Sequence, residues 1–174
     1  MKGPHRAKYD EWMLALRYAA LLALVVWVGG LLALGGIAAP SVFDVIGASH
    51  VPDAGLLAGA VFGETLRRFA LVTYGCGAVL LLTLLTRGIL GPRPRRFAWR
   101  AALAVLMLAT ALASGIVVTG RINQVRDEIG VAPSSLPEND ARRVLFGRLH
   151  GLSTGLQLIP LLGGLALLYW EIKE

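Results

Sequence analysis

The sequence has few of the residue types on which most catalytic and metal sites are built. Its 174 residues include one cysteine, three histidines and three methionines. A chain with a single cysteine cannot form an internal disulfide, and Cys76 lies in an apolar run where it is interpreted as a packing residue. Zinc-protease, phosphate-binding-loop and nucleophile-elbow motifs are also missing. The sequence therefore gives no positive sign of enzymatic chemistry, and we expect no resident cofactor.

Long apolar runs are abundant instead. Hydrophobic residues make up 56% of the chain and the mean hydropathy is +0.65, whereas soluble domains contain roughly 45–50% apolar residues. Four stretches approach the roughly 20 residues needed to cross a bilayer, and none has an ionisable side chain in its middle. They cover residues 18–39, 69–86, 98–118 and 152–170. The sequence predicts one all-α membrane domain over residues 1–174, a bundle of four transmembrane helices.

The basic residues predict how this bundle is oriented. The net charge is +6, and the Lys and Arg residues lie between and beside the apolar runs. They are interpreted as topology signals and lipid-headgroup contacts, so the bilayer is the expected partner and nucleic acid is not. One side of the membrane has the denser basic segments, at Lys2, Arg6, Lys8, Arg17, Arg87, Arg93, Arg95, Arg96, Arg100 and Lys173. The positive-inside rule predicts that this side, with both termini, is cytoplasmic.

The helices are expected to differ in length. No proline occurs between residues 54 and 90, and Asp53 is suited to cap a helix that begins well before the membrane. The third helix is expected to continue to Gly130, and the fourth to resume near Pro137. Helix two and the hairpin between helices three and four should therefore extend beyond the bilayer on the outer side. Pro40 is placed in the first outer connection.

Glycines recur at helical spacing and predict close packing. In lipid, small residues let helix backbones approach each other. Within the bundle this would be helix packing; the alternative is a face that joins two copies or another membrane protein. The candidate positions are Gly29, Gly30, Gly55, Gly59, Gly63, Gly147, Gly151 and Gly155.

A polar stripe is predicted on the fourth helix. His150, Ser153, Thr154 and Gln157 are three or four residues apart, so they share one face of a helix. Polar groups in lipid need partners, and the stripe is expected to face the bundle. Interhelical hydrogen bonding is the plainer interpretation. A proton, ligand or metal role for His150 is the alternative.

Charged and polar residues also gather at the predicted outer end. Glu64 and Arg68 are four residues apart and can form an ion pair. If the helices project from the bilayer, a ligand site could form where helices three and four meet. The candidate ligand-binding residues are His150, Asn123, Asp127, Arg121 and Gln157. The alternative interpretation is a collar of salt bridges at the membrane surface.

Several of these segments carry a family resemblance. The runs WVGGLLALGGIAAPSVF (27–43), AGLLAGAVF (54–62), RINQVRDE (121–128) and FGRLHGLSTGLQL (146–158) resemble the transmembrane-protein-205-like family. That family is a bacterial group of unknown function with an animal relative. The resemblance implies a four-helix domain of the bacterial cytoplasmic membrane and leaves the activity open. The matching positions are Trp27, Gly29, Gly30, Pro40, Arg121, Asn123, Asp127, His150, Gly151 and Ser153.

A looser likeness connects the chain to copper-resistance-D type membrane domains. It rests on the Trp-x-Gly-Gly turn at Trp27 and the Leu-His pair at His150, while the scarcity of His, Met and Cys departs from a metal-handling pattern. The leading hypothesis is a non-enzymatic membrane protein, either a packing or partner module or a small-ligand binder. The alternative hypothesis is a copper- or haem-linked role in transport or redox chemistry. The ligand, the process and the oligomeric state are left open by the sequence.

Overall fold

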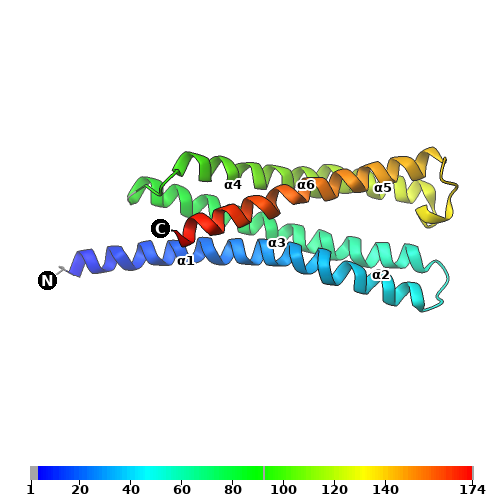
Figure 1. The fold of residues 1–174 in the computed structure, drawn as a ribbon, viewed down its shortest axis with the longest axis horizontal. Helices are drawn as coiled ribbons and strands as arrows, with labels where there is room; N and C mark the ends of the chain where they lie inside the picture. Colours follow the sequence, from blue (N-terminus) through cyan, green and yellow to red (C-terminus); the bar gives the residue numbers. More distant parts are fainter. Residues whose placement is uncertain (1–3, 92, 174) are drawn as a thin grey trace.

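Four long helices run back and forth to form one elongated bundle. The computed structural model describes residues 4–91 and 93–173. Figure 1 shows both termini and the 91–96 connection at one end, which we call the terminal end. The connections 49–53 and 130–140 lie at the other end, which we call the loop end. The all-α fold predicted from the hydropathy pattern is confirmed.

Each rod is built from one or more helical elements. The first comprises α1 (Pro4–Ala33), η1 (Leu34–Ala38) and α2 (Ala39–Ala48), and the second is α3 (Ala54–Leu90). The third comprises α4 (Phe97–Leu112), η2 (Ala113–Val118) and α5 (Thr119–Ile129). A short 3₁₀ turn, η3 (Pro133–Ser135), precedes the fourth, α6 (Ala141–Ile172). Both η1 and η2 are π-helical, a rare form that is frequent at functional sites.

The four rods are long and apolar enough to cross a membrane. The 37 residues of α3 measure about 55 Å at about 1.5 Å per residue. A hydrocarbon core is only about 30 Å thick. The prediction that this helix exceeds the bilayer is therefore confirmed, and the chain is a multi-pass membrane protein by length and composition.

The rods pack in a ring. α1 contacts α3, α3 contacts α4, α4 contacts α6, and α6 closes the ring against α1. Large buried apolar side chains lie where all four rods meet, and they include Leu24, Trp27, Leu84, Met107 and Leu167. Large apolar side chains are otherwise exposed along every rod, as expected for a surface that contacts lipid.

Three boundaries differ in detail from the sequence predictions. Pro40 does not begin a connection, because the helical rod continues through it from η1 into α2 and ends at Ala48. α6 begins at Ala141 rather than near Pro137, and Asp140 provides its N-cap. Asp53 stands at the N-cap of α3 as predicted, but its backbone is left-handed (φ 57°) and its side chain makes no capping bond. The stop at Gly130 is confirmed, with a left-handed φ of 69°.

Candidate functional site

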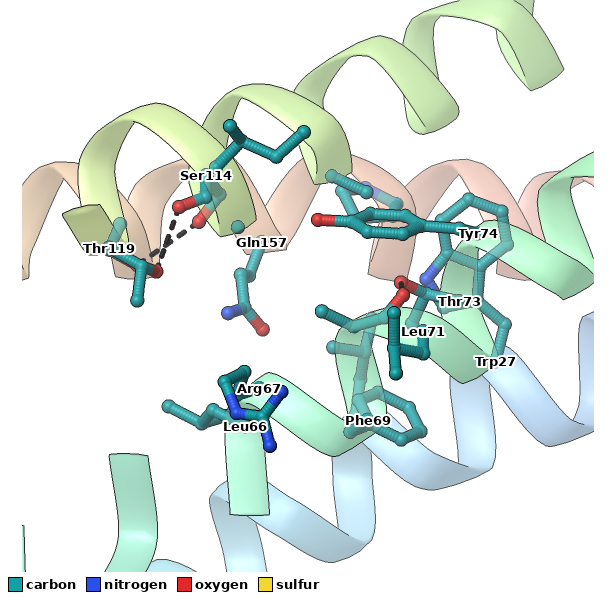
Figure 2. Close-up of a pocket in the computed structure, with 17 residues that line it drawn as sticks. Trp27, Leu66, Arg67, Phe69, Leu71, Thr73, Tyr74, Ser114, Thr119 and Gln157 are labelled. Carbon is teal, nitrogen blue, oxygen red and sulfur yellow. Dashed lines mark hydrogen bonds between the residues drawn. The ribbon is translucent and has the colours of Figure 1, made fainter. Parts of the chain in front are cut away.

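A cavity of about 200 Å³ lies near the middle of the bundle, displaced toward the loop end. All four rods line it: α1 with Trp27, α3 with Arg67 and Tyr74, the third rod with Ser114, and α6 with Gln157. Figure 2 shows these side chains surrounding an open space between the helices. The cavity is therefore a feature of the assembled bundle rather than of any single helix.

Some polar groups around the cavity already have protein partners. Thr73 donates its hydroxyl hydrogen to the carbonyl oxygen of Ala70 over 2.8 Å. The hydroxyl oxygens of Ser114 and Ser153 are 3.1 Å apart and hydrogen-bonded, which joins η2 to α6. Thr119 donates to the carbonyl oxygen of Ser114 over 2.9 Å. These hydroxyls are tied into the walls of the cavity.

Three other polar groups have no such partner. The indole Nε1 of Trp27 is buried, in a residue that is 1% exposed, and makes no hydrogen bond with any described residue. The Tyr74 hydroxyl and the Gln157 amide likewise make none within the described chain. In Figure 2 the Gln157 amide and the Tyr74 hydroxyl both point into the open space. Buried polar groups are nearly always hydrogen-bonded, so the buried Trp27 N–H, with two partly exposed polar groups beside it, indicates a place for a bound molecule.

The aromatic walls of the cavity depend on glycines of neighbouring helices. A Cβ atom at Gly115 would collide with the Tyr74 hydroxyl, and one at Gly30 would collide with the Phe69 ring. A Cβ at Gly77 would lie 2.8 Å from the Leu108 side chain and 3.3 Å from the Trp27 ring. Gly30 was predicted as a close-approach site, and the structure confirms it. Gly77 and Gly115 were not predicted, because each is a single glycine outside any repeat.

One side of the cavity faces the lipid-exposed surface. Leu71 and Ile116 both line it, yet they are 63% and 62% exposed. They belong to α3 and η2, which are neighbours in the ring of helices. A lipophilic molecule in the bilayer would reach the cavity between these two elements without crossing water.

The predicted ligand residues fall mostly outside this cavity. Gln157 lines it, but His150, Asn123, Asp127 and Arg121 do not, and all four are exposed. His150 stacks on the Phe146 ring, with ring centroids 6.3 Å apart. No hydrogen bond or ion pair joins these four residues to one another among the described residues. The expected convergence is not seen, and a ligand-binding role for them stays a prediction.

The polar stripe on α6 faces the bundle only along one edge. Ser153 and Gln157 line the cavity, as expected. His150 and Thr154 are exposed, and the Thr154 hydroxyl is satisfied by the carbonyl oxygen of His150 at 3.0 Å. Viewed down the axis of α6, Ser153 points in nearly the same direction as the buried residues of this helix. His150 and Thr154 point further toward the exposed side.

The predicted glycine stripes make little contact within the chain. A Cβ at Gly29, Gly59, Gly147, Gly151 or Gly155 would meet no atom within 4 Å. In the first stripe of α3, a Cβ at Gly55 would lie 3.3 Å from the Ala132 Cβ, and one at Gly63 would lie 3.8 Å from Arg126. The close packing of α6 instead occurs at Gly163 and Gly164, against Met107 and Val28. The stripe at 147, 151 and 155 therefore does not close the bundle, and its role between copies stays a prediction.

The terminal end holds a buried charge cluster that the sequence analysis missed. We use the term ion cluster for Glu171, Arg87, Arg100 and Arg17. Glu171 Oε1 accepts hydrogen bonds from Arg87 at 2.9 Å and from Arg100 at 2.6 Å. Arg17 donates to the carbonyl oxygen of Glu171 over 3.0 Å. Glu171, Arg100 and Arg87 are 4%, 2% and 6% exposed, so this cluster ties all four rods together below the surface.

These arginines had been placed among the basic residues of the connections. Arg87 lies instead inside α3 and Arg100 inside α4, and both are buried. A usable signal was available in Glu171, which is an acid placed beside a basic membrane interface at the end of an apolar run. Such a residue is well placed to pair across helices.

Ion pairs at the loop end are exposed by comparison. Glu64 accepts hydrogen bonds from Arg67 at 2.7 Å and from Arg68 at 2.8 Å, which confirms the predicted pair with Arg68. Asp140 caps α6 by accepting from the Arg142 backbone N–H at 2.8 Å. Its hydrogen bonds with the Arg142 side chain and backbone lower the pKa of Asp140 from 3.8 to about 2.

The family comparison matches residues 22–130 to the family described as Domain of unknown function (DUF4149). The match covers more than half of the chain. This chain belongs to that family. Three of the four runs that carried the resemblance lie inside the matched region, and the run from residue 146 to 158 lies outside it. Neither the curated proteins nor the solved structures contain a match.

Proposed function

We propose that this protein is a non-enzymatic membrane protein that binds a small lipophilic molecule in the cavity that all four rods line. The observation that carries the proposal is the buried indole N–H of Trp27, a residue that lines the cavity; this N–H has no partner among the described residues. An apolar cavity of about 150 Å³ can hold a benzene ring. The cavity here is about 200 Å³ and suits a ring with small substituents.

We extend the family membership to the narrower kinship with the transmembrane-protein-205-like group. The sequence runs at 27–43, 54–62 and 121–128 support it, and all three lie within the matched region. The proposal includes residence in a bacterial cytoplasmic membrane with both termini inside. The support for that orientation is the dense basic sequence at the terminal end.

The metal- or haem-linked alternative draws no support from the described residues. They contain no group of three or more His, Cys, Asp or Glu side chains that could hold a metal ion. His150 is exposed and stacks on Phe146 rather than on a second potential ligand. Ligand binding in the cavity is therefore the function that we carry forward.

The test uses Trp27 as its own reporter. The chain has four tryptophans, and Trp27 is the buried one, whereas Trp99 is 72% exposed. Two single-tryptophan proteins, one retaining Trp27 and one retaining Trp99, are reconstituted in lipid nanodiscs and titrated with bromobenzene. We expect saturable quenching of Trp27 and linear quenching of Trp99, because only the first adjoins a cavity of fixed capacity.

A cavity-filling pair of variants makes the test specific. Ala111 lines the cavity, whereas Ala109 is exposed on the same helix. Ala111→Leu should abolish the saturable quenching, and Ala109→Leu should leave it unchanged. Ala70→Leu fills the cavity from α3 and replaces Ala111→Leu if that variant is not folded. Linear quenching of Trp27 in the unfilled protein would overturn the proposal.

A further inference from the structure

One unpartnered group at the cavity, the Trp27 indole, can only donate a hydrogen bond. An indole N–H can only donate, so the group that meets Trp27 must be an acceptor. A tyrosine hydroxyl and a glutamine amide can each donate as well, at Tyr74 and Gln157. The hydroxyl hydrogens of Thr73 and Thr119 are already committed to backbone carbonyls. A complementary molecule therefore presents at least one acceptor atom, to Trp27, and Tyr74 and Gln157 can donate to further acceptors.

The electrostatics of the lining favour a neutral molecule. Arg67 is the one cationic side chain among the lining residues, and no carboxylate lines the cavity. The Arg67 guanidinium donates from Nε and from an Nη to the two carboxylate oxygens of Glu64, over 2.7 and 2.8 Å. Its charge is thus partly offset within the protein, because Glu64 also pairs with Arg68. An anion would lose its hydration in exchange for one arginine that already binds Glu64, and a cation would meet no carboxylate among the described lining residues.

The shape of the cavity suits a flat ring that arrives from the bilayer. The rings of Trp27, Phe69 and Tyr74 contribute to its walls. The exposed apolar side chains of Leu71 and Ile116 border it on the lipid side. Aromatic walls pack well against planar rings. A ring with an attached apolar chain could place the ring inside and leave the chain between α3 and η2, in lipid.

From these three observations we propose that the cavity binds the head ring of a quinone-type lipid. The class is a neutral, planar, lipophilic ring whose carbonyl oxygens accept hydrogen bonds from Trp27, Tyr74 and Gln157. This inference rests on the proposed function and narrows it to one class of ligand. It assigns binding alone, and no electron transfer or other chemical step is part of it.

The experiment compares two molecules of nearly the same shape. Duroquinone is a tetramethylated benzoquinone, and durene is the tetramethylated benzene that lacks both oxygens. Binding of each to protein in nanodiscs is measured by equilibrium dialysis, with empty nanodiscs subtracted for partitioning into lipid. We expect duroquinone to bind at least about 10-fold more tightly, because durene would leave the buried Trp27 N–H unsatisfied.

Variants then ask whether the named donors cause this preference. Trp27→Phe removes the indole N–H and keeps an aromatic ring, and Gln157→Leu removes the amide at similar size. Each should weaken duroquinone binding several-fold and leave durene binding nearly unchanged. Thr154→Val is the control on the same helix, since Thr154 is exposed and lies outside the cavity. If Trp27→Phe is poorly folded, Gln157→Leu carries the test.

The outcomes separate this inference from the function it rests on. Equal binding of durene and duroquinone would overturn the quinone class while leaving a lipophile site intact. A preference that survives both Trp27→Phe and Gln157→Leu would also overturn it, because the named donors would not be the cause. If neither molecule binds and bromobenzene quenches Trp27 only linearly, the cavity holds water and both proposals fail.

Discussion

Two polar clusters lie within the same four rods, and they differ in how their groups are paired. At the terminal end, the ion cluster brings three arginines to one glutamate, and its buried Oε1 is shared by Arg87 and Arg100. Glu171 Oε2 accepts no hydrogen bond from a described residue, but it lies 3.8 Å from the Arg17 Nε as an ion pair. Toward the loop end, the cavity is bordered by neutral groups that have no partner among the described residues. Charges buried in a bundle must be paired to be tolerated, whereas neutral groups can be left open at a smaller cost. The first cluster therefore suits a structural role, and the second suits a ligand.

The largest effect is expected when the carboxylate of the ion cluster is removed, which tests the structural role of this cluster directly. Glu171→Ala leaves Arg87 and Arg100 buried without the group that they share, and we expect a loss of about 3–5 kcal/mol in stability. Glu171→Gln should lose less, because the amide oxygen still accepts a hydrogen bond. Thermal unfolding in nanodiscs measures both effects.

The matched control for this prediction is Glu64→Ala. It removes a carboxylate that also pairs with two arginines, but whose side chain is 42% exposed. Its effect on the unfolding temperature should be much smaller, because water and salt screen exposed pairs. An equal shift for Glu64→Ala and Glu171→Ala would mean that burial of the ion cluster does not matter, and the structural role would fail.

The second prediction compares the two halves of α6. A Cβ at Gly164 would collide with the Val28 side chain, so Gly164→Ala should cost about 1–3 kcal/mol. A Cβ at Gly151 meets no atom within 4 Å, so Gly151→Ala should cost nothing in the isolated chain. Thermal unfolding of both variants, with size-exclusion chromatography in detergent, checks this contrast.

The same pair of variants addresses the proposed association between copies. If the stripe at 147, 151 and 155 joins two molecules, Gly151→Ala should reduce the fraction of dimer without destabilising the monomer. If Gly151→Ala destabilises the monomer as much as Gly164→Ala, the arrangement of α6 in the bundle described above is wrong.

The sequence predicted the positions of the four rods well, but it predicted poorly which side of each rod faces the interior of the bundle. Spans follow from apolar length, which burial of the backbone in lipid makes almost obligatory. The rotation of α6 was harder, because Gln157 and His150 share a stripe, yet only Gln157 reaches the cavity. Which edge of a polar stripe faces inward is decided by side chains on the other helices, such as Met107 against Gly163. Those contacts join residues far apart in the chain, and the local pattern does not contain them.

The ion cluster and the cavity were missed for related reasons. Arg87 and Arg100 looked like ordinary topology signals, because a basic residue at the end of a span is usually in the headgroup region. Their burial depends on Glu171, which is 71 residues or more distant in sequence. Part of the cavity wall, with Ser114 and Ile116, comes from the π-helical turn of η2. No residue pattern in that run distinguishes a π turn from an α turn.

The smallest effect on stability is expected at the loop end, from the charge of Asp140, which caps α6. Asp140 accepts hydrogen bonds from the side chain and backbone of Arg142, and these lower its pKa from 3.8 to about 2. The folded state therefore favours the ionised form. Its contribution to stability is complete above about pH 4 and is lost as the pH falls toward 2, because the unfolded chain takes up its proton first.

Hydrogen exchange in the first turn of α6 measures this effect. Exchange there should quicken as the pH is lowered from 4 to 2, after correction for the intrinsic rate, while exchange beside Gly164 should not change in step. Asp140→Asn keeps a capping oxygen without the charge and should remove most of this pH dependence. A wild-type pH response that persists in Asp140→Asn would assign the titration to another group. The first turn of α6 would then be stabilised by contacts other than this cap. The difference between exposed charges at the loop end and buried charges at the terminal end would then not rest on Asp140.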